Sequence, residues 1–134
     1  MNRLNHTIAI LAYNNHDLTL KNINHLIMGG YKNNILLFDN GSNPSYENNA
    51  SKLQIRYQRV PENIFVNPAW NIIINQEECD YLTLLNNDCF ILSPNYFNDV
   101  LNHMHQNDIG ISSCKTKNIV SFNRSLETAK FFFF

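Results

Sequence analysis

The sequence predicts an α/β domain with a mostly parallel central sheet that carries helices on both faces. Short apolar runs rich in β-forming residues alternate along the chain with segments whose apolar residues recur at helical spacing. The main runs are apolar at consecutive positions, which is typical of parallel strands buried on both faces. Polar clusters follow three of these runs, as expected where strands leave a sheet. All residues, 1–134, are interpreted as one domain, since this length suffices for a single core.

Each element is predicted from a local pattern. Strands are expected over Thr7–Tyr13, Asn34–Phe38, Ile55–Val60, Tyr81–Leu85, Cys89–Leu92 and Ile109–Cys114. Helices are expected from His16 to the Gly29-Gly30 pair, and over Tyr46–Leu53, Ala69–Glu78 and Pro94–Gln106. An Asn or Asp is expected to cap the first helix, and Pro68 to occupy the first position of the third.

Composition excludes several classes of partner. The formal net charge of −1 gives no electrostatic footprint for nucleic acid or an anionic membrane. No apolar run approaches the roughly 20 residues that a membrane span needs, and the N-terminus lacks the apolar region of a signal peptide. Cys79, Cys89 and Cys114 have no C-x-x-C spacing, which indicates reduced thiols and a cytoplasmic protein.

Three polar clusters end successive buried runs, at Tyr13-Asn14, Asp39–Ser42 and Asn86–Asp88. The carboxyl ends of parallel strands lie at one edge of a sheet, so the clusters are expected to converge on one crevice. Asp88 is a hard oxygen donor of the type that holds Mg²⁺ or Mn²⁺ beside a diphosphate. The alternative at this point is that these are ordinary polar loops and turns.

Four motifs, which occur in a particular order and spacing along the chain, make this interpretation more specific. They are Ala-Tyr-Asn, Phe-Asp-Asn-Gly-Ser, Glu-Asn-Ile-Phe followed by Pro-Ala-Trp-Asn-Ile-Ile-Ile, and Tyr-Leu-Thr-Leu-Leu-Asn-Asn-Asp. Together they resemble the donor-binding, N-terminal half of family-two glycosyltransferases over about residues 7–117, with 118–134 as a tail. The resemblance implies a Rossmann-like nucleotide-diphospho-sugar transferase fold.

The resemblance also implies roles for residues after the first two strands. Tyr13 would lie against the nucleoside base, with Asn14 in the same nucleotide-sugar site. Asp39 would hydrogen-bond the base or ribose. The alternative for Asp39 is an Asx turn with Gly41 and Ser42.

The other implied roles concern the second half of the site. Asn71 would line the diphosphate-sugar side, or else be a plain surface residue of its helix. Asn86 and Asn87 would approach the ribose and the metal. Asp88 would ligate the Mn²⁺ or Mg²⁺ that bridges the diphosphate.

The implied reaction moves a sugar from a nucleotide-diphosphate donor to the hydroxyl of a saccharide or lipid-linked acceptor, with inversion, in surface polysaccharide or glycolipid synthesis. Peripheral membrane association fits such an acceptor. The sequence departs from the family pattern at Phe65 and Ile73, which replace glycines, and at Asn86, which replaces the first Asp of the acidic motif.

Family members continue beyond this length, into the acceptor site and the general base. The chain is therefore expected to be a truncated or frame-shifted product of a longer gene, because the four codons of Phe131–Phe134 can form a T tract that slips during replication. Whether it acts as an enzyme stays open. The alternative is an inactive fragment or a non-catalytic nucleotide-binding module, and a sheet edge exposed by truncation would favour self-association. Another doubly wound fold is a third interpretation, although no Gly-x-Gly-x-x-Gly or Gly-Lys-Ser/Thr motif is present.

Overall fold

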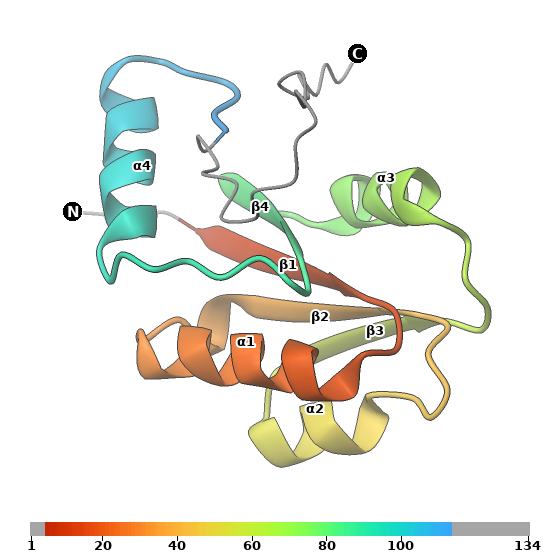
Figure 1. The fold of residues 1–134 in the computed structure, drawn as a ribbon. Coiled ribbons are helices and arrows are strands. Elements are labelled where there is room, and N and C mark those ends of the chain that lie inside the picture. The colour runs from red at the N-terminus through yellow and green to blue at the C-terminus, as the bar shows by residue number, and fades with distance from the viewer. Residues whose placement is uncertain (1–4, 114–134) are drawn as a thin grey trace, which may run out of the picture.

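The computed structural model describes residues 5–113 and shows one sheet with helices on both sides (Figure 1). The elements, in chain order, are β1 (His6–Ala12), α1 (His16–Met28), the short 3₁₀ helix η1 (Lys32–Asn34), β2 (Ile35–Asn40), α2 (Glu47–Leu53), β3 (Arg56–Val60), α3 (Val66–Gln76), β4 (Tyr81–Asn86) and α4 (Tyr96–Gln106). None of these helices is long and apolar enough to cross a membrane.

The strands pair in the order β3-β2-β1-β4, and each neighbouring pair is parallel. The two inner strands, β1 and β2, are buried along their whole length, as their continuous apolar runs predicted. The edge strand β3 is half exposed, in keeping with its alternating sequence. The predicted α/β fold with a parallel sheet is therefore confirmed.

One face of the sheet is covered by α1 and α2, together with the start of α4. Alternate residues Ile8 and Ile10 of β1 pack there against Ile23 of α1, and Tyr46 and Phe97 join the same core. The rings of Tyr31 and Tyr96 meet Phe97 edge-on at 4.9 and 5.3 Å between centroids. This aromatic contact attaches α4 to the α1 side of the sheet.

The opposite face is covered by α3 alone among the described helices (Figure 1). Ala9 and Leu11, which alternate with the residues of the first core, pack here against Trp70 and Ile73. Ile73 stands where the family pattern has a glycine, and it is fully buried against the sheet. The substitution therefore fills the interface between α3 and the sheet with an apolar side chain.

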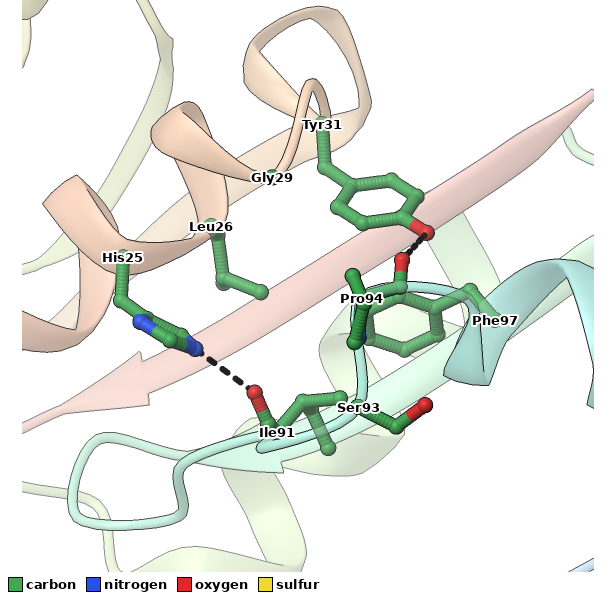
Figure 2. Close-up of a pocket in the computed structure, with 8 residues that line it drawn as sticks. All are labelled: His25, Leu26, Gly29, Tyr31, Ile91, Ser93, Pro94 and Phe97. Atoms are coloured by element: carbon green, nitrogen blue, oxygen red, sulfur yellow. Dashed lines mark hydrogen bonds between the residues drawn. The ribbon is translucent and has the colours of Figure 1, made fainter.

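The predicted strand over Cys89–Leu92 is wrong. This segment is an irregular connection, and carbonyl groups in it accept hydrogen bonds from side chains of α1, of which Figure 2 shows the contact between His25 and Ile91. Asn22 Nδ2 donates to the Cys89 carbonyl at 2.9 Å, and His25 Nε2 lies 2.7 Å from the Ile91 carbonyl. Side-chain donors thus satisfy backbone groups that a strand would have paired with another strand.

The predicted strand over Ile109–Cys114 is also wrong within residues 109–113, and Cys114 lies outside the described residues. The N–H of Ile109 donates to the Met104 carbonyl at 2.9 Å, which closes the last turn of α4. Asp108 has a positive φ of 52°, so the chain leaves the helix through a left-handed residue.

The helix starts differ from the predictions in detail. Asn15 precedes α1, but its side chain makes no capping bond, and its φ of 53° is left-handed. Pro68 is the third residue of α3, which begins at Val66. Tyr46 precedes α2 and is buried in the core, with its ring stacked on His16 at 4.1 Å.

Candidate functional site

A cleft of about 660 Å³ opens at the carboxyl ends of β1, β2 and β4, on the side of the sheet covered by α3. Its lining comes from these strand ends, from the segment before α3 and from the start of that helix. The lining residues are Leu11, Tyr13, Asn40, Asn63, Phe65, Val66, Asn67, Pro68, Asn86, Asn87 and Asp88. Amide, aromatic and apolar side chains dominate, and Asp88 is the one charged residue among them.

The end of β4 supplies the polar wall of the cleft. Asn86 and Asp88 are exposed, while Asn87 is half-buried and bonded to the protein. The Asn87 N–H donates to the Leu11 carbonyl at 3.2 Å, and its Nδ2 donates to the Thr19 hydroxyl at 2.9 Å. The structure therefore brings all three residues together, with Asn87 anchoring the turn that carries Asp88.

Asn22 of α1 holds the same turn from behind. It is fully buried, and its Nδ2 donates to the carbonyls of Asn87 at 3.2 Å and Cys89 at 2.9 Å, on either side of Asp88. Its Oδ1 is buried and has no partner among the described residues. Sequence reasoning missed Asn22, although an Asn at a core position of an amphipathic helix is a signal for such a role.

The end of β1 contributes two residues with different surroundings. Tyr13 is half exposed and lines the cleft. Asn14 does not line it. The Asn14 N–H donates to the Ser42 hydroxyl at 2.9 Å, and its Oδ1 accepts from the Asn43 N–H at 2.9 Å. The Tyr46 hydroxyl also donates to the Asn14 carbonyl. Asn14 therefore joins the loops that follow β1 and β2.

Asp39, at the end of β2, is fully buried beneath the loop that follows it. Its Oδ1 accepts from the Ser42 N–H at 2.8 Å, in the Asx turn predicted as the alternative. Its Oδ2 accepts from the Tyr46 N–H at 3.1 Å and the Tyr57 hydroxyl at 2.8 Å, and pairs with Arg59 Nε at 3.3 Å. The carboxylate faces α2 and β3, and it does not line the cleft.

The ionisation of Asp39 follows from these partners. Burial raises the pKa of a carboxyl, but the hydrogen bonds from Ser42, Tyr46 and Tyr57 outweigh it and hold the pKa of Asp39 below its usual value. Burial, followed by the hydrogen bond to Asp39, raises the pKa of Tyr57 to about 12. Asp39 is therefore an anion and Tyr57 a neutral donor at neutral pH.

Asn40, the next residue, points to the opposite face of β2 and lines the cleft. It is 2% exposed, and its amide bonds the segment before α3. Its Nδ2 donates to Asn63 Oδ1 at 3.1 Å and to the Phe65 carbonyl at 3.2 Å, and its Oδ1 accepts from the Ile64 N–H at 3.1 Å. Sequence reasoning placed Asn40 in a polar cluster without giving it a role.

Gly41 brings this segment against the end of β2. Its φ is +78°, and a Cβ there would lie 2.4 Å from the Glu62 carbonyl carbon and 2.6 Å from the Asn63 nitrogen. No side chain fits at that distance, so this glycine is required for the close approach of the two backbones.

Asn71 is exposed on α3 and is not among the residues that line the cleft. Asn71 therefore does not share the lining of the cleft with Tyr13 and Asn86–Asp88. Its predicted contact with the diphosphate sugar, like the ligand contacts predicted for Asn14 and Asp39, stays a prediction.

The cleft fits a divalent cation by the chemistry of its oxygen donors. Mg²⁺ is usually bound by one or two carboxylates together with substrate phosphates, and the Asp88 carboxylate and the Asn86 amide oxygen are donors of the required kind. No group of three or more His, Cys, Asp or Glu side chains within residues 5–113 is arranged to hold a metal by protein ligands alone. A cation held by Asp88 would complete its coordination with neutral oxygens, water or the phosphates of a substrate.

A second, much smaller cavity of about 20 Å³ lies between α1 and the segment that leads to α4 (Figure 2). Leu26, Tyr31, Ile91 and Phe97 are among its lining residues, and the Tyr31 hydroxyl donates to the Pro94 carbonyl at 3.1 Å. Its volume is close to that of one water molecule. This cavity belongs to the joint that attaches α4, and it is too small for a substrate.

An all-parallel sheet, helices on both faces and a cleft at the carboxyl ends of the strands define a Rossmann-like α/β protein of the ligand-binding type. The family model described as Glycosyl transferase family 2 matches residues 7–132, and the chain belongs to this family. The match extends past residue 117, where the sequence resemblance was expected to end. A search among curated proteins found no match.

Family membership confirms the resemblance seen in the sequence and supports a glycosyltransferase-like function. It implies a nucleotide-sugar donor and an acceptor.

Proposed function

We propose that the cleft binds a nucleotide-diphosphate sugar together with Mn²⁺ or Mg²⁺, and that the chain transfers the sugar to the hydroxyl of a saccharide or lipid-linked acceptor. The pathway we propose is the synthesis of a surface polysaccharide or glycolipid. Cys79 is a free thiol, which supports a cytoplasmic location.

The charge of the cleft is the observation that carries this proposal. Asp88 is its one charged lining residue, and no Lys or Arg of the described chain lines it. Arg59 is paired with Asp39, and Arg56 with Glu77 at 2.5 Å. A diphosphate placed beside Asp88 would meet a like charge, so a cation between them is needed to make the contact favourable.

The remaining residues of the cleft have roles that follow from their positions. Asn86 offers amide groups to the hydroxyl and phosphate oxygens of a donor. Asn87 and Asn22 hold the turn that carries Asp88, so the carboxylate is positioned before the ligand arrives. When bound, the cation would stabilise the charge that develops on the departing nucleoside diphosphate.

A protein that binds the nucleotide sugar without transferring it is the second candidate. Asp88 is assigned to the cation, so among residues 5–113 no other carboxylate of the cleft remains to act as a general base on the acceptor hydroxyl. Release of nucleoside diphosphate from a nucleotide sugar, with and without a sugar acceptor, distinguishes the two candidates.

The donor site is tested by thermal unfolding with Mn²⁺ and a panel of nucleoside diphosphates. A ligand at about 100 times its dissociation constant adds roughly 2.7 kcal/mol of stability, which raises Tm by about 10 °C in a domain of this size. We expect such a shift for at least one nucleotide, and we expect EDTA or Asp88→Asn to abolish it.

Asp99→Asn is the matched control, because Asp99 is an exposed carboxylate on α4 that does not line the cleft. It should leave the shift unchanged. The absence of any nucleotide-dependent shift in a folded wild-type protein would overturn the donor site. A shift that survives both EDTA and Asp88→Asn would overturn the metal.

A further inference from the structure

Phe65 has a backbone conformation that side chains rarely adopt. Its φ of 67° and ψ of 177° lie in a region that is essentially restricted to glycine. The chain therefore keeps the backbone path of a glycine while carrying a phenyl ring on it, at a cost in free energy.

Hydrogen bonds with the side chains of the buried Asn40 and the exposed Asn63 hold Phe65 in this conformation. Asn40 Nδ2 donates to the Phe65 carbonyl at 3.2 Å, and Asn63 Oδ1 accepts from the Phe65 N–H at 2.8 Å. Both polar groups of the Phe65 backbone are therefore engaged. The close contact of Gly41 with Glu62 and Asn63 fixes the preceding residues as well.

Core packing does not account for the strain, because the Phe65 side chain contributes little to the core. The residue is 76% exposed, and it lines the cleft. A large apolar side chain that is strained, exposed and positioned on a rigid segment is typical of a ligand contact.

The strand order indicates which part of a donor lies near Phe65. Asn40, which holds Phe65, ends β2, and Asp88 follows β4, while β1 lies between the two strands. Neighbouring strands are about 4.8 Å apart, so the two ends of the cleft are separated by roughly 10 Å. With the diphosphate at Asp88, the ribose extends across β1 and the base reaches the β2 end.

We propose that Phe65 is a nucleotide-binding residue on whose ring the planar base of the donor nucleotide stacks. This inference rests on the proposed donor site. Stacking on an aromatic side chain accepts any base, since every base has a π-face. Phe65 thus provides a hydrophobic surface that increases nucleotide affinity through the base and not through the diphosphate.

Two substitutions separate the ring from the backbone. Phe65→Leu keeps a side chain with a Cβ, and hence the same backbone strain, but it removes the aromatic face. Phe65→Tyr keeps the face. Two ligands, each titrated calorimetrically in the presence of Mn²⁺, separate the base from the phosphates: the nucleoside diphosphate bound best by the wild type, and inorganic pyrophosphate, which has no base.

We expect Phe65→Leu to weaken nucleoside diphosphate binding about tenfold and to leave pyrophosphate binding unchanged, and Phe65→Tyr to bind both within about twofold of the wild type. Equal affinities of wild type and Phe65→Leu for the nucleotide would overturn the inference alone. Equal weakening of both ligands would also overturn it, because the ring would then act through the scaffold. A folded wild type that binds neither ligand would overturn the proposed function and this inference with it.

Discussion

Replacing Asp39 with Asn tests whether this buried carboxylate holds the ends of the strands together. The change keeps the shape of the side chain and removes its charge. Oδ1 of Asp39 accepts from the Ser42 N–H, and Oδ2 accepts from the Tyr46 N–H and the Tyr57 hydroxyl. An amide offers one acceptor atom and one donor atom in place of these two acceptors.

Whichever way the amide is oriented, its NH₂ group faces a backbone N–H, either that of Ser42 or that of Tyr46. A buried donor left without an acceptor costs about 1–3 kcal/mol, and the remaining hydrogen bonds weaken because the acceptor is no longer charged. The Arg59 side chain is partly exposed, so water replaces much of its lost ion pair. We therefore expect Asp39→Asn to lower the free energy of unfolding by about 2–4 kcal/mol and Tm by about 10 °C.

The pH dependence gives a second test of the same reasoning. The pKa of Asp39 is lower in the folded protein than in the unfolded chain. Its contribution is therefore complete above the unfolded carboxyl pKa near 4, and it is lost as the pH falls through the lower, folded-state pKa. The difference in stability between wild type and Asp39→Asn should be constant above about pH 5 and should shrink in more acidic solution.

Urea unfolding followed by far-ultraviolet circular dichroism and by the fluorescence of Trp70, the one tryptophan, measures both effects. Asp99→Asn, a change of the same chemistry on the exposed side of α4, is the control and should alter stability by less than about 0.5 kcal/mol. A loss below about 1 kcal/mol for Asp39→Asn, or a difference independent of pH down to the acid transition, would refute this account of Asp39.

Two further predictions concern buried polar groups on α1 and β1. Burial lowers the pKa of His6 from 6.5 to about 4. Between pH 6.5 and pH 4, His6 therefore takes up a proton in the unfolded chain but not in the folded protein. The free energy of unfolding of the wild type should fall by up to about 3 kcal/mol from pH 6.5 to pH 4. In His6→Gln, urea unfolding should show a pH dependence without this contribution. The same pH dependence in both proteins would contradict the prediction. Asn22→Leu leaves the carbonyls of Asn87 and Cys89 without their donor but removes the unpartnered Oδ1, so we expect a net loss of about 2 kcal/mol. If Asn22→Leu unfolds at the same midpoint urea concentration as the wild type, the hydrogen bonds from Asn22 to the two carbonyls do not contribute to stability.

Only some of the residues that the sequence predicted for the site line the cleft in the structure. Tyr13 and Asn86–Asp88 were predicted to converge, and they line one cleft. Asn14 and Asp39 were assigned to the same crevice because they also follow strands. Asn14 instead bonds the loop after β2, Asp39 bonds the backbone before α2, and neither lines the cleft. The prediction considered where each strand ends, but not on which face of the sheet each side chain lies. Alternation along β2 places Asp39 and Asn40 on opposite faces, so the sequence already held part of this distinction.

The segment after β4 shows a different limit. Cys89–Leu92 is apolar and rich in strand-forming residues, and by itself it fits a strand. Its carbonyls instead accept from Asn22 and His25, which lie more than sixty residues earlier in the chain. Contacts at such separations follow from tertiary packing, and no local pattern reveals them.

The sequence by itself determined the class of fold, the two fully buried strands and the edge of the sheet where the cleft lies, because periodicity and polar strand ends are local properties of a chain. Only the tertiary structure decided which face of the sheet each polar residue serves, and that the buried Asn40 and the close approach of Gly41 hold Phe65 in a glycine-like conformation at the cleft. These features depend on hydrogen bonds and backbone contacts between segments that come together only when the sheet and α3 are assembled.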